Sequence, residues 1–232
     1  MGARQSAEAR NVGPVSTLED PRVTATLDRT YAESNAQMAE LRTNAGRFAQ
    51  LESATAQERA DALSDIYMPV TRESGRLIYS LVRASRPQTI VEFGMSLGLS
   101  AIHLAAAVRD NGVGRIYTTE LSTAKIEGAK RNFTDTGLDD LIEVLAGDAL
   151  ETLKSVDGPI GFVLLDGWKE LYVPVLEIIE PRLSPGAIVL ADNTSMDGTK
   201  PYLEYVRDPA NGYVSVNFPV RDSDSMELSC RV

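Results

Sequence analysis

Oxygen-bearing side chains follow two short apolar runs in the second half of the sequence. The run 162–165 leads into Asp166, and the run 188–191 leads into Asp192 and Asn193. If the runs are neighbouring parallel strands, these side chains reach the same edge of the sheet. Two carboxylates and an amide oxygen suit Mg²⁺ or another hard divalent cation, whereas zinc is disfavoured because the chain has one His and one Cys. Each residue alone could instead cap a helix, but capping explains the paired clusters poorly.

Lys169 is the candidate general base. It lies three residues after Asp166, close to the proposed cation. A lysine beside a bound dication loses its proton more readily and can then accept one from a substrate hydroxyl. The alternative for any lysine viewed alone is an exposed side chain with no catalytic part.

A glycine-containing turn follows the apolar run 89–93. The spacing of Gly94 and Gly98 is Gly-x-x-x-Gly, so the pyrophosphate-binding pattern Gly-x-Gly-x-x-Gly is not present. Glu92 precedes the turn and would repel a pyrophosphate. It suits a cationic group instead, such as the amino group of a methionine moiety, directly or through water. An ordinary strand-to-helix turn is the alternative.

Two more acids lie where a nucleotide would bind. Glu120 ends the second predicted strand, where an acid commonly accepts hydrogen bonds from ribose hydroxyls; it could also face water or cap the next helix. Asp148 follows the third predicted strand and could accept from an adenine amino group or cap the next helix.

The elements that position these residues alternate after Pro87 between short apolar runs and helical patterns. This alternation predicts βαβ units and a doubly wound parallel sheet. Strands are expected at 89–93, 115–119, 141–145, 161–165 and 187–191, and helices should begin near Leu99, Ser122, Leu150 and Tyr172.

The C-terminal segment departs from this alternation. The runs 213–218 and 226–231 are separated by the turn-like stretch 221–225, which predicts an antiparallel hairpin. A parallel sheet that ends in such a hairpin is the design of class I methyltransferases, whereas a nicotinamide-binding Rossmann domain continues with a parallel strand. The predicted fold is therefore α/β and Rossmann-like, with a mostly parallel seven-stranded sheet, a C-terminal antiparallel hairpin and N-terminal helices.

One domain is expected over residues 23–232. Residues 1–22 are polar and lack periodicity, so they are predicted to form a flexible leader. Apolar residues recur at helical spacing over 23–81, which predicts helices that form a cap or a homodimer interface, and 88–232 forms the core.

Charge and composition limit the classes of molecule that the protein is expected to bind. The formal net charge of −10 argues against nucleic acid and anionic membranes and favours a small-molecule substrate. The single cysteine, Cys230, cannot form an internal disulfide, and no apolar run is long enough for a signal peptide or a membrane span. The expected location is the cytoplasm.

Several motifs, in order, resemble the catechol O-methyltransferase family. They are Asp166-Gly-Trp-Lys169, Leu190-Ala-Asp-Asn193 and the stretch 201–207, and the resemblance extends back to about Tyr67. It implies that Asp166, Asp192 and Asn193 ligate Mg²⁺ and that Lys169 is the general base. It also implies an S-adenosylmethionine site; the predicted contacts, including those from the turn and the strand ends, are Met68, Val70, Glu92, Gly94, Ser96, Ser100, Glu120, Asp148, Asp166 and Trp168.

The sequence departs from that family at positions that shape the substrate site. Gly167 stands where the catechol enzyme has a histidine. Pro219 or Val220 replaces the acid that holds the second catechol hydroxyl, and Ile66 and Asp197 replace a Trp and a Pro of the wall.

The expected activity is S-adenosylmethionine-dependent methyl transfer to a metal-chelated hydroxyl of a small catechol-like or vicinal-diol substrate. Two alternatives remain: a small-molecule methyltransferase that works without a metal, and a non-catalytic S-adenosylmethionine-binding protein. Measuring activity after a chelator has removed the metal would separate the first alternative from the expected activity. The second is disfavoured because a protein that only binds needs no base.

Overall fold

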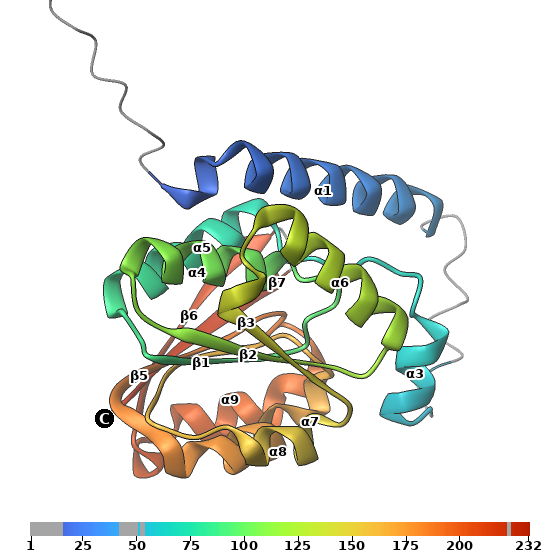
Figure 1. The fold of residues 1–232 in the computed structure, drawn as a ribbon. Coiled ribbons are helices and arrows are strands. Elements are labelled where there is room, and N and C mark those ends of the chain that lie inside the picture. Colours follow the sequence, from blue (N-terminus) through green and yellow to red (C-terminus); the bar gives the residue numbers. More distant parts are fainter. Residues whose placement is uncertain (1–15, 42–50, 52–53, 222–223) are drawn as a thin grey trace, which may run out of the picture.

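A seven-stranded sheet forms the centre of the computed structural model, which describes residues 16–41, 51, 54–221 and 224–232 (Figure 1). The strand order is β3-β2-β1-β4-β5-β7-β6. Strands β1 to β5 pair in parallel, and β7 pairs antiparallel with both β5 and β6. The predicted fold class and the C-terminal hairpin are confirmed. The strands are β1 Thr89–Phe93, β2 Arg115–Glu120, β3 Ile142–Ala146, β4 Ile160–Leu165, β5 Leu183–Ala191, β6 Tyr213–Arg221 and β7 Asp224–Arg231.

Helices cover both faces of the sheet (Figure 1). On one face lie α4 Arg72–Ser85, α5 Leu99–Asn111 and α6 Thr123–Thr136, with α1 Pro21–Leu41 outside them. On the other lie α7 Ala149–Thr152, α8 Tyr172–Ile179 and α9 Lys200–Arg207, while α3 Ala56–Ala62 stands at the end of the sheet. Short 3₁₀ segments are η1 Thr17–Glu19, η2 Asp139–Leu141, η3 Leu153–Ser155, η4 Lys169–Leu171, η5 Glu180–Arg182, η6 Asp197–Thr199 and η7 Pro209–Asn211.

The central strands are apolar on both faces, because helices cover both. In β4, Phe162 and Leu164 join the core beneath α4 and α5, while Val163 and Leu165 join the core beneath α8. This alternation follows from the two-residue period of a strand, and continuous apolar runs are typical of parallel strands buried on both sides. The sheet is therefore firmly held where its strands end, which is where the candidate site lies.

Helices α4 and α5 approach closely at one glycine. A Cβ atom at Gly75 would lie 2.5 Å from Nε2 of His103, a contact that real side chains do not make. His103 is buried, and its Nδ1 lies 2.8 Å from the carbonyl oxygen of Leu99. Burial lowers the pKa of His103 to about 4, so the ring stays neutral between the two helices at neutral pH.

The N-terminal segment differs from the expected leader at its end. Ser16 caps η1, and the backbone N–H of Thr17 donates to Oδ2 of Asp110 at 3.0 Å. Helix α1 begins at Pro21, two residues before the predicted boundary. The expected leader residues 1–15, and residues 42–50 and 52–53 of the predicted helical region, lie outside the described residues. In the described part of the chain, no helix has the length and apolar character needed to cross a membrane.

Candidate active site

A cavity of about 1050 Å³ lies at the carboxyl ends of the parallel strands. Residues at the end of each of the five parallel strands, or one or two positions beyond it, line the cavity: Gly94, Glu120, Asp148, Asp166 and Asp192. Open α/β sheets bind ligands at this edge, so the cavity is the expected place for the active site.

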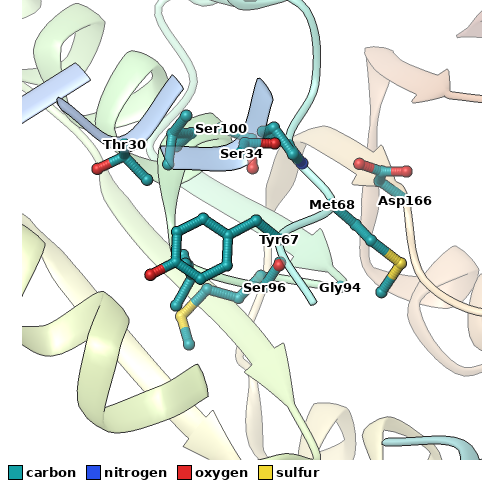
Figure 2. Close-up of a pocket in the computed structure, with 12 residues that line it drawn as sticks. Thr30, Ser34, Tyr67, Met68, Gly94, Ser96, Ser100 and Asp166 are labelled. Carbon is teal, nitrogen blue, oxygen red and sulfur yellow. The ribbon is translucent and has the colours of Figure 1, made fainter. Parts of the chain in front are cut away.

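A narrow recess adjoins the cavity beneath α1. Figure 2 shows Ser34 of α1, Tyr67 and Met68 of the segment before α4, and Ser96 of the turn after β1 gathered around it, with Asp166 at one side. The structure thus brings together Met68, Gly94, Ser96, Ser100 and Asp166 along the recess, and Val70, Glu120, Asp148 and Trp168 along the larger cavity.

The turn after β1 needs the glycine that the sequence places there. Gly94 has φ +95°, and a Cβ atom on it would lie 2.7 Å from the carbonyl oxygen of Asp166. Two residues on, Ser96 has φ 49°, and its backbone N–H donates to Oε2 of Glu120 at 2.9 Å. The backbone therefore passes close to the end of β4 and leaves room for a ligand above it.

Glu120 is held rigidly at the end of β2. Its Oε1 accepts hydrogen bonds from the backbone N–H groups of Leu121 and Ser122, each at 2.9 Å, in addition to the bond from Ser96 to Oε2. Three backbone hydrogen bonds thus fix the carboxylate in the cavity wall. Its role in holding ribose hydroxyls stays a prediction.

Glu92 lies behind the wall and does not line the cavity. It is fully buried, and its Oε2 accepts a hydrogen bond from the hydroxyl of Thr118. Burial raises the pKa of Glu92 to about 7. Oε1 has no hydrogen-bond partner among the described residues. Glu92 is therefore set back from the residues that line the cavity, and its contact with the cofactor amino group, directly or through water, stays a prediction.

Asp148 performs the capping role that the sequence left open. It is the N-cap of α7, and its Oδ1 accepts from the backbone N–H of Leu150 at 2.9 Å. It also lines the cavity, so capping does not remove it from the ligand surface. A hydrogen bond to an adenine amino group stays a prediction.

The proposed metal-binding carboxylates lie side by side because β4 and β5 are neighbours. Leu165 pairs with Ala191, and the next residues are Asp166 and Asp192. The backbone N–H of Asp192 donates to the carbonyl oxygen of Leu165 at 2.9 Å. Burial raises the pKa of Asp166, the nearby charge of Asp192 raises it further, and Lys169 opposes both. Positive charge is therefore favoured at this point of the cavity.

Lys169 contacts one of these carboxylates, that of Asp166. Its Nζ donates to Oδ1 of Asp166 at 3.1 Å and to the hydroxyl oxygen of Tyr172 at 2.9 Å. Tyr172 in turn donates to the carbonyl oxygen of Asp192 at 2.9 Å. Lys169 begins η4 and Tyr172 follows it by three residues, and side chains at this spacing eclipse in a 3₁₀ turn. Tyr172 was not predicted as a site residue from the sequence, although its i, i+3 spacing from Lys169 is a signal for this contact.

Asn193 is held by Asp224, a second residue that was not predicted from the sequence. It has φ 56°, and its Nδ2 donates to Oδ2 of Asp224 at 2.6 Å. Asp224 begins β7, 31 residues further along the chain. A separation of this length leaves no local pattern from which the contact could be predicted.

Trp168 forms a wall of the cavity beneath α3. The guanidinium carbon of Arg59 lies 4.4 Å from the centroid of the Trp168 ring, and Arg59 also pairs with Glu170.

The glycine at position 167, where the catechol enzyme has a histidine, has a physical reason. A Cβ atom there would lie 2.5 Å from the ring of Phe93. Of the two substituted wall positions, Asp197 lines the cavity, whereas Ile66 is buried away from it.

Comparisons with known proteins agree with this architecture. A methyltransferase domain model matches residues 91–194. The chain is 29% identical over 214 residues to a probable O-methyltransferase of Mycobacterium tuberculosis, covering 87% of this chain and 85% of the relative. It is 31% identical over 148 residues to the catechol O-methyltransferase of Sus scrofa, covering 60% of this chain and 78% of the relative.

A solved structure extends the agreement to the fold. The O-methyltransferase from Bacillus cereus in complex with SAH superposes with a TM-score of 0.67 at 21% identity, covering 90% of this chain and 91% of that one. At that identity the likeness shows the fold alone. Sequence relatives and fold together identify the chain as an S-adenosylmethionine-dependent O-methyltransferase that belongs to the catechol O-methyltransferase-like family of class I enzymes.

Proposed function

We propose that this enzyme methylates one hydroxyl of a small catechol-like or vicinal-diol substrate with the help of Mg²⁺ or another hard divalent cation. One observation carries the proposal: Asp166, Asp192, Asn193 and Lys169 line the same end of the cavity. The carboxylates offer oxygen ligands, and the lysine lies within hydrogen-bond distance of one of them.

The residues present fit a hard cation. Asp166 and Asp192 would supply carboxylate oxygens, and the amide oxygen of Asn193 would be the third protein ligand. Within the described ranges, no three His, Cys, Asp or Glu side chains are grouped so that they could hold a metal by themselves. Two carboxylates and an amide form the hard, incomplete donor set that suits Mg²⁺, which keeps several positions for water or substrate oxygens. Asp192 is buried and the side chain of Asp166 is only 13% exposed, so a neutralising cation is favoured beside them.

The chain's own residues would then act as follows. When bound, the dication would lower the pKa of an acceptor hydroxyl, and S-adenosylmethionine would supply the methyl group from its sulfonium. Nζ of Lys169, held by Tyr172, would take the hydroxyl proton. The rigid turn at Gly94 and Ser96 would position the cofactor beside Asp166. Holding the reacting groups in place is worth up to about 7–11 kcal/mol in favourable intramolecular models.

Methylation assays test the proposal directly. The purified protein, with S-adenosylmethionine and Mg²⁺, should methylate a panel of catechols and other vicinal diols, and a chelator should abolish the reaction. Matched phenols with a single hydroxyl should react poorly, because they cannot offer two neighbouring oxygens. Full activity after chelation, or equal rates for the single-hydroxyl phenols, would remove the metal from the mechanism.

The ion pair between Lys169 and Asp166 favours one alternative. Lys169 already neutralises part of the charge of Asp166 at 3.1 Å, so a methyltransferase could use this pair without a cation. The same chelator experiment separates the two candidates, because only the metal-assisted enzyme loses activity.

A further inference from the structure

The C-terminal hairpin reaches the proposed metal site through one carboxylate. Asp224 stands at the first position of β7, and its Oδ2 accepts from Nδ2 of Asn193 at 2.6 Å. Its other oxygen, Oδ1, accepts from the backbone N–H of Ser225 at 2.8 Å, which fixes the plane of the carboxylate. Asn193 therefore meets an acceptor whose position is set by the backbone of β7.

The backbone around this contact is also tied down. The N–H of Thr194 donates to the backbone carbonyl oxygen of Ser225 at 2.9 Å, and the hydroxyl of Thr194 donates to the same oxygen at 3.0 Å. These bonds join the chain after β5 to the start of β7 on the C-terminal side of Asn193. The position of Asn193 is thus defined by β5 before it and by β7 beside it.

An amide side chain presents a different atom on each side. A carboxylate accepts hydrogen bonds, so the amide group of Asn193 must turn its nitrogen towards Asp224. The amide oxygen, which is the atom able to ligate a cation, then points away from Asp224. The contact therefore determines which end of the amide is left for a ligand.

The contact also accounts for the type of residue at position 193. Its φ of 56° lies in the left-handed region, which Asn and Asp tolerate better than other residues with a Cβ atom. An aspartate there would place a second carboxylate against Asp224, and like charges at hydrogen-bond distance are unfavourable. Asparagine satisfies both the backbone and its neighbour.

We propose that Asp224 is a positioning residue that orients the amide oxygen of Asn193 towards the divalent cation, so that the C-terminal hairpin tunes metal affinity. This inference rests on the metal site of the proposed function. Residues that hold a metal ligand from behind typically change metal affinity by about 10–100-fold when they are replaced.

Calorimetric titration of Mg²⁺ and Mn²⁺ into the purified protein tests the inference without any turnover. Asp224→Ala should weaken cation binding by about 10–100-fold. Asp224→Asn keeps an oxygen that can accept from Asn193, so it should retain most of the affinity. Ser225→Ala is the matched control in the same strand, since Ser225 contacts Thr194 instead of Asn193; it should bind the cations as the wild type does, with thermal unfolding of each variant recorded alongside.

A spectroscopic measurement reads the contact itself. In ¹⁵N-labelled protein without added metal, the side-chain amide protons of Asn193 should show a shifted, slowly exchanging signal in the wild type and in Asp224→Asn. Asp224→Ala should lose that signal while the signals of other asparagines stay in place.

The outcomes separate this inference from the function on which it rests. Wild-type affinity in Asp224→Ala, or equal losses in Asp224→Ala and Ser225→Ala, would overturn the positioning role while leaving the metal site standing. Equal losses in Asp224→Asn and Asp224→Ala would mean that the charge of Asp224 acts on the cation directly, which also overturns it. Failure of the wild type to bind either cation would overturn the metal-assisted function and this inference together.

Discussion

Replacing Tyr172 by Phe removes a single oxygen atom from the interior of the site. That oxygen accepts a hydrogen bond from Nζ of Lys169 and donates to the carbonyl oxygen of Asp192, both at 2.9 Å. The ring is fully buried and packs edge-to-face against Phe93, with 6.3 Å between centroids, so Phe can occupy the same volume. The change is therefore confined to the two hydrogen bonds.

The expected magnitude follows from these bonds. A hydrogen bond to a charged group is worth about 1.5–3 kcal/mol, and Lys169 keeps its second partner, Asp166. If Tyr172 holds the lysine in position for proton transfer, the rate constant for methyl transfer should fall by about tenfold to a hundredfold, since each 1.4 kcal/mol or so in the barrier is tenfold. The affinity for S-adenosylmethionine should not change, because Tyr172 does not line the cavity.

Single-turnover methylation measures that rate constant, and calorimetry measures cofactor binding. Tyr202→Phe is the matched control: Tyr202 is equally buried and packs against Tyr172 with 5.6 Å between ring centroids, but it does not contact Lys169. A wild-type rate in Tyr172→Phe would refute the positioning of Lys169 by Tyr172. So would an equal loss in Tyr202→Phe, which would point to general loosening of the core.

Four further changes test other parts of the site and the fold. Lys169→Met should lower the methyl-transfer rate constant by about 10²–10⁴-fold, the usual span for a general base, with cofactor and cation affinities preserved in calorimetry. Asp192→Ala should abolish chelator-sensitive turnover and leave S-adenosylmethionine binding largely intact; full activity would contradict its role as a ligand. Glu120→Ala should raise the dissociation constant of S-adenosylmethionine by about tenfold to a hundredfold, from the loss of charge-assisted hydrogen bonds worth about 1.5–3 kcal/mol, and an unchanged constant would exclude contact with ribose. His103 has a folded-state pKa of about 4, below the usual 6.5, so the unfolded chain binds the extra proton and stability should fall as pH drops from 6.5 towards 4; urea unfolding of His103→Asn should lack that part of the slope.

Most of the sheet could be predicted because its strands carry continuous apolar runs. The bounds of β1 match the prediction at both ends, and β4 differs by one residue at its start. The largest difference is in β5, which begins at Leu183, four residues earlier than expected. A Pro-Gly pair such as Pro185-Gly186 is typical of turns, but Leu183 pairs with Ile160 of the neighbouring strand. Tertiary pairing overrides the local signal there.

The candidate site also contains residues that could be predicted from the sequence and contacts that could not. Asp166, Asp192 and Asn193 could be predicted because they directly follow buried strands, and strand ends meet at one edge of a parallel sheet. Asp224 could not, because its contact with Asn193 depends on how the hairpin returns to β5. The contact of Thr17 could not be predicted for a similar reason, since its partner is Asp110, 93 residues away.

The position of Trp168 has a practical consequence. It is the one tryptophan in the sequence, and it lines the cavity beneath the guanidinium group of Arg59. Light at the long-wavelength edge of tryptophan absorption excites this ring but not the tyrosines. The measured fluorescence would therefore come from one residue in the cavity wall. The intensity and colour of that emission would then report the arrival of cofactor, cation or acceptor in real time, with no label attached to the protein.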